Sequence, residues 1–103
     1  MVKQELPIKK IIGILGGMGP EATVHLCDLI VKKTRAEKDK DHIPMIIMNN
    51  PEIPDRTAAI IGEGDSPLPD LIKTAQSLEK AGAHFLVMPC VTAHHFYPDM
   101  IKK

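Results

Sequence analysis

Three short apolar runs alternate with longer amphipathic stretches along this chain. The runs are rich in Ile, Leu, Val and Met, which is typical of strands covered on both faces of a sheet; they span 11–15, 44–48 and 85–88. The stretches between them carry apolar residues at helical spacing and predict helices over 20–38, 56–61 and 67–81. Residues 98–103 resemble the beginning of one more helix. This alternation predicts an α/β fold with three layers around a short parallel sheet.

The 103 residues are enough for one modest domain. We therefore expect a single α/β domain over 1–103, with residues 1–10 as a polar lead-in. Three strands make a small sheet, and its apolar edge strands would be unpaired, which is a liability for a free protein. The last predicted helix is also short. We expect this chain to be part of something larger, or to pair with another copy of itself.

Composition narrows the classes of function. Thirteen basic and thirteen acidic residues cancel, so nothing points to nucleic acid or to an anionic membrane. The apolar runs are too short to span a bilayer, and the N-terminal residues lack the apolar core of a signal peptide. Two cysteines, Cys27 and Cys90, do not make a disulfide framework. We expect a soluble protein of the cytoplasm.

The segment 88–95 carries the strongest chemical signal. The third apolar run ends at Pro89, Cys90 follows at once, and Thr92 is suited to cap a new helical turn. Ligands of open α/β sheets bind at this carboxyl edge, and a helix N-terminus favours a thiolate over a thiol. The alternative is a small buried side chain, the usual role of a free cysteine. For Cys27, on the apolar stripe of the first helix, core packing is the preferred interpretation.

Two further segments are expected at the same edge. Glycines at 16–19 join the first strand to a helix, and Met18 within this turn could offer its backbone amide to an anion. The spacing fits neither a dinucleotide fingerprint nor a P-loop, and it favours a small carboxylate. Asn50 and Arg56 follow the second strand, and Arg56 is suited to bidentate binding of a carboxylate. The alternatives are a tight turn that needs glycine, and an exposed arginine paired with Asp55 or Glu52.

Histidines lie close to the cysteine. His94 and His95 could tune the Cys90 thiol or carry protons. A metal site would combine Cys90, His94 and His84, but this spacing matches no standard zinc pattern. We therefore expect no metal.

Together these motifs resemble the aspartate/glutamate racemase superfamily, specifically its aspartate racemase-like branch. The opening motif is IGILGGMGP at 12–20, and the first cysteine motif is PCVTAH at 89–94. Between them, HIP at 42–44, NNP at 49–51 and IPDRTAAI at 53–60 together form the second motif. Three separate motifs in the family's order make the resemblance specific, and it covers the chain from about residue 11 to the end.

The resemblance implies a function and roles for individual residues. Family members use no cofactor, and their active site lies between two similar α/β domains that each supply one catalytic cysteine. Cys90 would be one of this pair, and Arg56 would bind a side-chain carboxylate of the amino-acid substrate. Thr92 and the turn at Met18 would hold the α-carboxylate. Asn50 and Val91 fall beside these positions in the same motifs and are also assigned to substrate binding.

Two departures from the family pattern matter. Val91 replaces the usual asparagine, and valine cannot donate a hydrogen bond. The second half of the family fold is missing, with its cysteine and a substrate-binding lysine. We therefore expect the N-terminal half of a racemase, inactive alone unless two copies form a homodimer with facing Cys90 thiols. The alternatives are a non-catalytic carboxylate-binding or interaction module, and a one-cysteine decarboxylase or isomerase.

Overall fold

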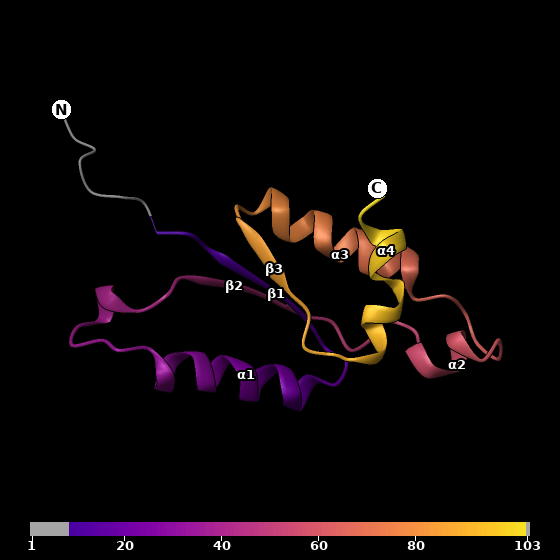
Figure 1. Ribbon diagram of the computed structural model, residues 1–103, viewed down its shortest axis with the longest axis horizontal. Helices are drawn as coiled ribbons and strands as arrows, with labels where there is room; N and C mark the ends of the chain where they lie inside the picture. The colour runs from indigo at the N-terminus through magenta and orange to yellow at the C-terminus, as the bar shows by residue number, and fades with distance from the viewer. Residues whose placement is uncertain (1–8, 103) are drawn as a thin grey trace.

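A computed structural model describes residues 9–102 of the chain (Figure 1). The strands are β1 (Ile12–Gly16), β2 (Met45–Asn49) and β3 (Phe85–Val87). The α-helices are α1 (Pro20–Lys33), α2 (Arg56–Ile60), α3 (Leu68–Lys80) and α4 (Tyr97–Met100). Two short 3₁₀ helices are η1 (Asp39–Asp41) and η2 (Thr92–Phe96).

The three strands form a parallel sheet in the order β2-β1-β3. Ile12 of β1 is in register with Met45 of β2 and with Phe85 of β3, so the carboxyl ends of all three strands lie at one edge. Helix α1 runs along one face of the sheet, and α3 and α4 lie on the other face (Figure 1). The predicted α/β fold with three layers and a short parallel sheet is confirmed.

The main core lies between β1 and α3. It continues along α3 because Leu71 and Leu78, seven residues apart, point to the same side of the helix. The buried cluster consists of Leu15, Met18, Ile53, Leu71, Leu78 and Ala93. Three of these residues follow the carboxyl ends of the strands rather than lying in the sheet. The core therefore extends directly beneath the edge at which ligands of such folds bind.

The face of the sheet that carries α1 is covered less completely than the apolar runs predict. Ile14 in the central strand is fully buried there, but its neighbours in the register, Ile47 and Val87, belong to edge strands. Ile47 is 46% exposed and Phe85 is 48% exposed. A single helix covers the central strand and not both edges. On the other face, Met48 and Leu86 in the edge strands are each 40% exposed. The expectation that every strand is covered on both faces is thus wrong for the edge strands of the described chain.

Several predicted boundaries also change. Helix α1 ends at Lys33 rather than at residue 38, because Thr34 adopts an extended backbone and its amide bonds to the carbonyl of Ile30 at 3.2 Å. The predicted Ser66 cap of α3 is wrong: Pro67 is the N-cap residue and no side chain caps the helix. The Oγ of Ser66, one residue before the cap, accepts a hydrogen bond from the amide of Leu68 at 3.1 Å. Cys27, expected in the core, is half-buried on α1.

Two expectations concern the ends of the chain and the membrane. Residues 1–8 of the predicted polar lead-in over 1–10 lie outside the described residues. The predicted helix at 98–103 corresponds to α4, which begins one residue earlier. Within residues 9–102, no helix has the length and apolar character that crossing a bilayer requires.

Candidate active site

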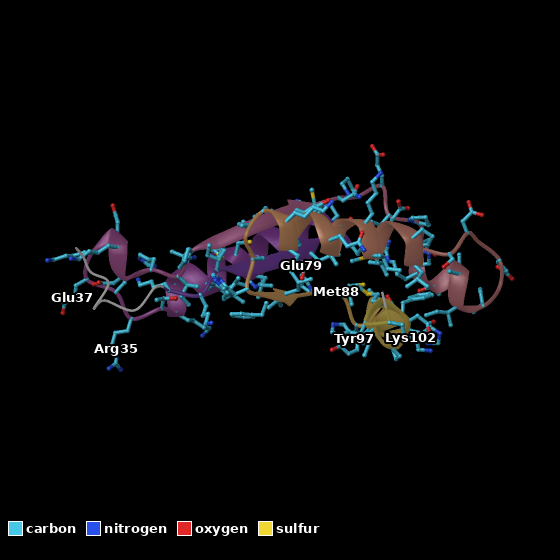
Figure 2. The ribbon with its side chains drawn as sticks, turned by 90° about the horizontal axis from the view of Figure 1, so that it is seen from above. Arg35, Glu37, Glu79, Met88, Tyr97 and Lys102 are labelled. Atoms are coloured by element: carbon cyan, nitrogen blue, oxygen red, sulfur yellow. The ribbon has the colours of Figure 1, made fainter. Side chains whose placement is uncertain are left out.

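Three segments converge at the carboxyl edge of the sheet: the glycine turn after β1, the loop after β2 and the loop after β3. Met18, Ile53 and Ala93, one from each segment, are buried in the same cluster. Helix α2 also contacts η2. The charged loop after α1, marked by Arg35 and Glu37, lies at one end of the molecule, and Tyr97 lies in the other half (Figure 2). The predicted site residues are thus brought together at the carboxyl edge of the sheet by the fold.

The glycine turn is held in place by close packing. Gly17 has a φ of 110°, and a Cβ added there would lie 2.2 Å from the carbonyl oxygen of Asn50. A Cβ on Gly16 would lie 2.3 Å from the hydroxyl of Thr23. Both positions therefore need glycine for steric reasons, which supports the interpretation as a tight turn. Binding of a carboxylate by this turn stays a prediction.

Thr23 is a structural residue of this turn that the sequence analysis missed. Its side chain is 1% exposed, and its hydroxyl accepts a hydrogen bond from the amide of Gly17 at 3.0 Å. The same hydroxyl donates to the carbonyl of Gly19 at 3.3 Å. A threonine one turn into a helix that starts at a glycine turn was the available signal. Thr23 fixes the backbone on both sides of Met18.

Met18 and Asn50 use their side chains to hold the site together. The side chain of Met18 is buried, and a contact of its backbone amide with a ligand stays a prediction. Asn50 donates its backbone amide to the carbonyl of Gly16 at 3.0 Å, and its Oδ1 accepts from the amide of Glu52 at 3.1 Å. Asn50 therefore anchors the loop after β2 to the glycine turn, and its contact with a substrate stays a prediction.

Arg56 begins α2 behind the cap residue Asp55, whose Oδ2 accepts from the amide of Ala58 at 2.9 Å. The Nη1 of Arg56 donates to the carbonyls of Ile53 at 3.1 Å and Pro54 at 3.2 Å. Its Nε is buried and has no hydrogen-bond partner in the described part of the chain. Arg56 is therefore bonded to its own loop rather than to the neighbouring carboxylates, and one guanidinium donor remains unsatisfied.

Cys90 lies just beyond β3, half-buried against the core cluster. Its Sγ lies 3.4 Å from Oγ1 of Thr92. The predicted cap is wrong: Val91 is the N-cap residue of η2, no side chain caps this 3₁₀ helix, and the Thr92 hydroxyl faces the thiol instead. Val91 is 91% exposed. The thiol thus has a hydroxyl partner on the protein side, next to an apolar side chain that stands in solvent.

His84 and His94 lie at opposite ends of β3. His94 Nε2 lies 2.8 Å from the carbonyl oxygen of Met88, close to Cys90. His84 precedes β3, and its Nδ1 accepts a hydrogen bond from the amide of Ile11 at 2.8 Å. It lies at the other end of the strand, so a metal site that combines His84 with Cys90 is not assembled. Over residues 9–102, no group of three or more potential metal-ligating side chains is present.

Comparison with known proteins identifies related chains. The family model described as Asp/Glu/Hydantoin racemase matches residues 15–103. The chain is 35% identical over 95 residues to the broad specificity amino-acid racemase RacX of Bacillus subtilis (strain 168). This match covers 86% of the chain and 40% of RacX.

Two solved structures have the same fold. The aspartate racemase of Picrophilus torridus superposes with a TM-score of 0.81 at 40% identity, over 86% of this chain and 38% of that one. An aspartate racemase homologue from Pyrococcus horikoshii OT3 superposes with a TM-score of 0.71 at 28% identity, over 92% of this chain and 41% of that one. The chain thus spans about two fifths of the length of these relatives.

Proposed function

We propose that this chain, which belongs to the Asp/Glu/hydantoin racemase family, is the N-terminal half of a cofactor-independent amino-acid racemase. The observation that carries the proposal is the Cys90 thiol at the carboxyl edge of the sheet, 3.4 Å from the Thr92 hydroxyl. The names of the relatives support racemisation of amino acids as the activity of the whole protein. Their length supports the interpretation as one half of an enzyme.

The proposed chemistry needs two thiols. Cys90, as the thiolate, takes the α-proton from one face of the substrate, and the electron pair of the broken C–H bond stays on a planar carbanion. A second thiol, supplied from outside this chain, delivers its proton to the opposite face and becomes the thiolate. Charge and protons balance, and the same steps run in reverse for the other enantiomer. No oxidant, reductant or cofactor takes part.

Arg56 supports a substrate with a second carboxylate. Its buried Nε has no acceptor among the described residues, and an unsatisfied donor is costly. A substrate carboxylate that reached Nε would satisfy this donor in the bidentate geometry that arginine favours. We therefore propose an acidic amino acid, with the α-carboxylate held by Thr92 and the backbone near Met18. Asn50 follows β2 and Val91 follows β3, so both lie at the same carboxyl edge of the sheet.

The surroundings of the Cys90 thiol are open to solvent, and we propose that a second domain covers them. Val91, beside Cys90, is 91% exposed. A reaction at an α-carbon benefits from a site that excludes water and presents groups on both faces of the substrate. The described residues supply groups on one side only. A second domain would close the site and supply the opposite thiol.

The test joins this chain to the C-terminal part of the Picrophilus torridus enzyme and measures deuterium incorporation at the α-carbon of aspartate and glutamate in D₂O. We expect no exchange by the isolated chain and clear exchange by the fusion. Chiral chromatography follows the interconversion of the enantiomers, which needs both thiols. The fusion that carries Cys90→Ser should lose this interconversion, whereas Cys27→Ser should retain it. A folded fusion that does not interconvert the enantiomers, or interconversion that survives Cys90→Ser, would contradict the proposal.

A homodimer with facing Cys90 thiols is the alternative to a missing half. It predicts exchange by the isolated chain that rises with the square of protein concentration and coincides with a dimeric mass in solution. Exchange by a monomer would contradict both arrangements.

A further inference from the structure

The loop that carries Cys90 is closed by hydrogen bonds on both of its sides. The carbonyl oxygen of Met88 lies 2.8 Å from the amide of Cys90 and 2.8 Å from Nε2 of His94. The amide of His94 also donates to the carbonyl of Val91 at 3.1 Å. One main-chain oxygen at the end of β3 therefore connects to the thiol-bearing residue and to the histidine four positions later.

The contact with the Met88 carbonyl determines which ring nitrogen of His94 carries the hydrogen. A main-chain carbonyl can only accept, so Nε2 of His94 must carry the hydrogen. In the neutral ring this is the Nε2–H tautomer. A glutamine side chain presents an N–H at a similar reach and can replace this donor, whereas leucine fills similar space without one.

We propose that His94 is a positioning residue for Cys90: its Nε2–H holds the Met88 carbonyl and so fixes the loop that presents the thiol. Ala93 is fully buried in the core, which fixes the start of the histidine side chain. The ring then spans the distance from η2 back to the end of β3. Met88 lies close to the segment of η2 and α4 (Figure 2). The catalytic role of Cys90 rests on the proposed function. The hydrogen bond between His94 and Met88, and the experiment that tests it, do not depend on that function.

The competing explanation is that core contacts alone hold the loop. Cys90 packs against the buried cluster, and Ala93 belongs to it. If these contacts suffice, removing the imidazole has no effect on the thiol. The adjacent His95 offers a matched control, because its ring faces Phe96 edge-on, with 5.0 Å between the ring centroids.

The experiment uses the full chain with Cys27→Ser, so that Cys90 is the only thiol. Alkylation of Cys90 by iodoacetamide is followed by mass spectrometry at a pH above the ordinary titration range of cysteine, where accessibility sets the rate. We expect His94→Leu to raise this rate about fivefold, the factor that corresponds to one lost hydrogen bond. We expect His94→Gln and His95→Leu to stay within about twofold of the parent. The ¹⁵N spectrum of the His94 ring should show the Nε2–H tautomer.

Two results would overturn the proposal: a His94→Leu rate equal to that of His95→Leu, or a ring spectrum with the hydrogen on Nδ1. Circular dichroism shows whether each variant folds. If His94→Leu does not fold, the ring spectrum of the parent and the rate of His94→Gln decide. No substrate is involved, so failure of the proposed racemase function leaves this test unaffected.

Discussion

The two faces of the sheet are built differently. On the α3 face, Leu15, Leu71 and Leu78 are at most 2% exposed and pack together. On the α1 face, Ile14 is buried, but Ile47 and Phe85 at the edges remain about half exposed. Thr23 is the buried residue of α1. Met48 and Leu86, at the edges of the α3 face, are each 40% exposed as well. The two faces therefore differ at their centres, where α3 buries leucines against β1 and α1 buries Thr23, and not at their edges.

The α3 face is the one that supports the candidate site. Its cluster continues through Met18, Ile53 and Ala93, which belong to the three segments at the carboxyl edge. The α1 face contributes to the site at one point, the hydroxyl of Thr23 beneath the glycine turn. We conclude that the geometry of the site depends on the α3 core and on Thr23, and little on the outer surface of α1. Three substitutions, each paired with a control variant, test this comparison.

The largest effect is expected in the α3 core. Leu71→Ala removes a fully buried side chain and should lower the free energy of unfolding by about 3 kcal/mol, since the transfer and cavity terms add. Val31→Ala, on the exposed side of α1, should lower it by less than about 1 kcal/mol. Urea unfolding followed by circular dichroism measures both. Equal losses for the two variants would show that the faces are equivalent.

The next effect is expected in the glycine turn. Gly17→Ala adds a Cβ that meets the Asn50 carbonyl at a residue with positive φ, and should cost about 2 kcal/mol or more. Gly62 is the matched control, since its φ is 80° and nothing lies within 4 Å of its added Cβ. Gly62→Ala should cost about 1 kcal/mol, from backbone strain alone. A smaller loss for Gly17→Ala than for Gly62→Ala would argue against the close approach of the two loops.

The smallest effect is expected at Thr23. Thr23→Val keeps the shape but removes the hydroxyl, and leaves the amide of Gly17 without its partner, at a cost of about 1 kcal/mol. Amide hydrogen exchange at Gly17 should become about fivefold faster. Thr23→Ser retains the hydroxyl and should preserve the protection of this amide. Unchanged exchange in Thr23→Val would mean that packing alone holds the turn.

Much of the fold was predictable because it follows from local patterns. The apolar runs predicted all three strands, since a strand in a parallel sheet needs apolar side chains on both faces. Pro20 and the glycines predicted the start of α1. Ser66 and Pro67 predicted the start of α3 to within one residue, with the wrong cap residue. The end of α1 was misplaced by five residues, because Thr34 turns into extended backbone within a polar stretch without a clear stop signal.

The candidate site was predictable as a location and not as a set of contacts. Parallel strands bring their carboxyl ends to one edge, so the positions of Cys90 and Arg56 in the chain were sufficient to place them there. The contact of the Thr92 hydroxyl with the thiol was missed, because the choice between a cap and a thiol partner depends on how η2 is oriented. The bonds of Arg56 to Ile53 and Pro54 depend in the same way on the path of a loop.

Local patterns in the sequence were enough to predict the α/β class, the order of strands and helices along the chain, and the segments that carry a thiol, a guanidinium and a glycine turn. Periodicity, proline and glycine act over a few residues, and their physical effects are local. Three features became visible only in the folded chain: the partly exposed edges of the sheet, the support of the glycine turn by Thr23, and the link from Cys90 through Met88 to His94. These features depend on distances between segments that are far apart in the chain or on loop conformation, and only packing of the whole fold specifies them.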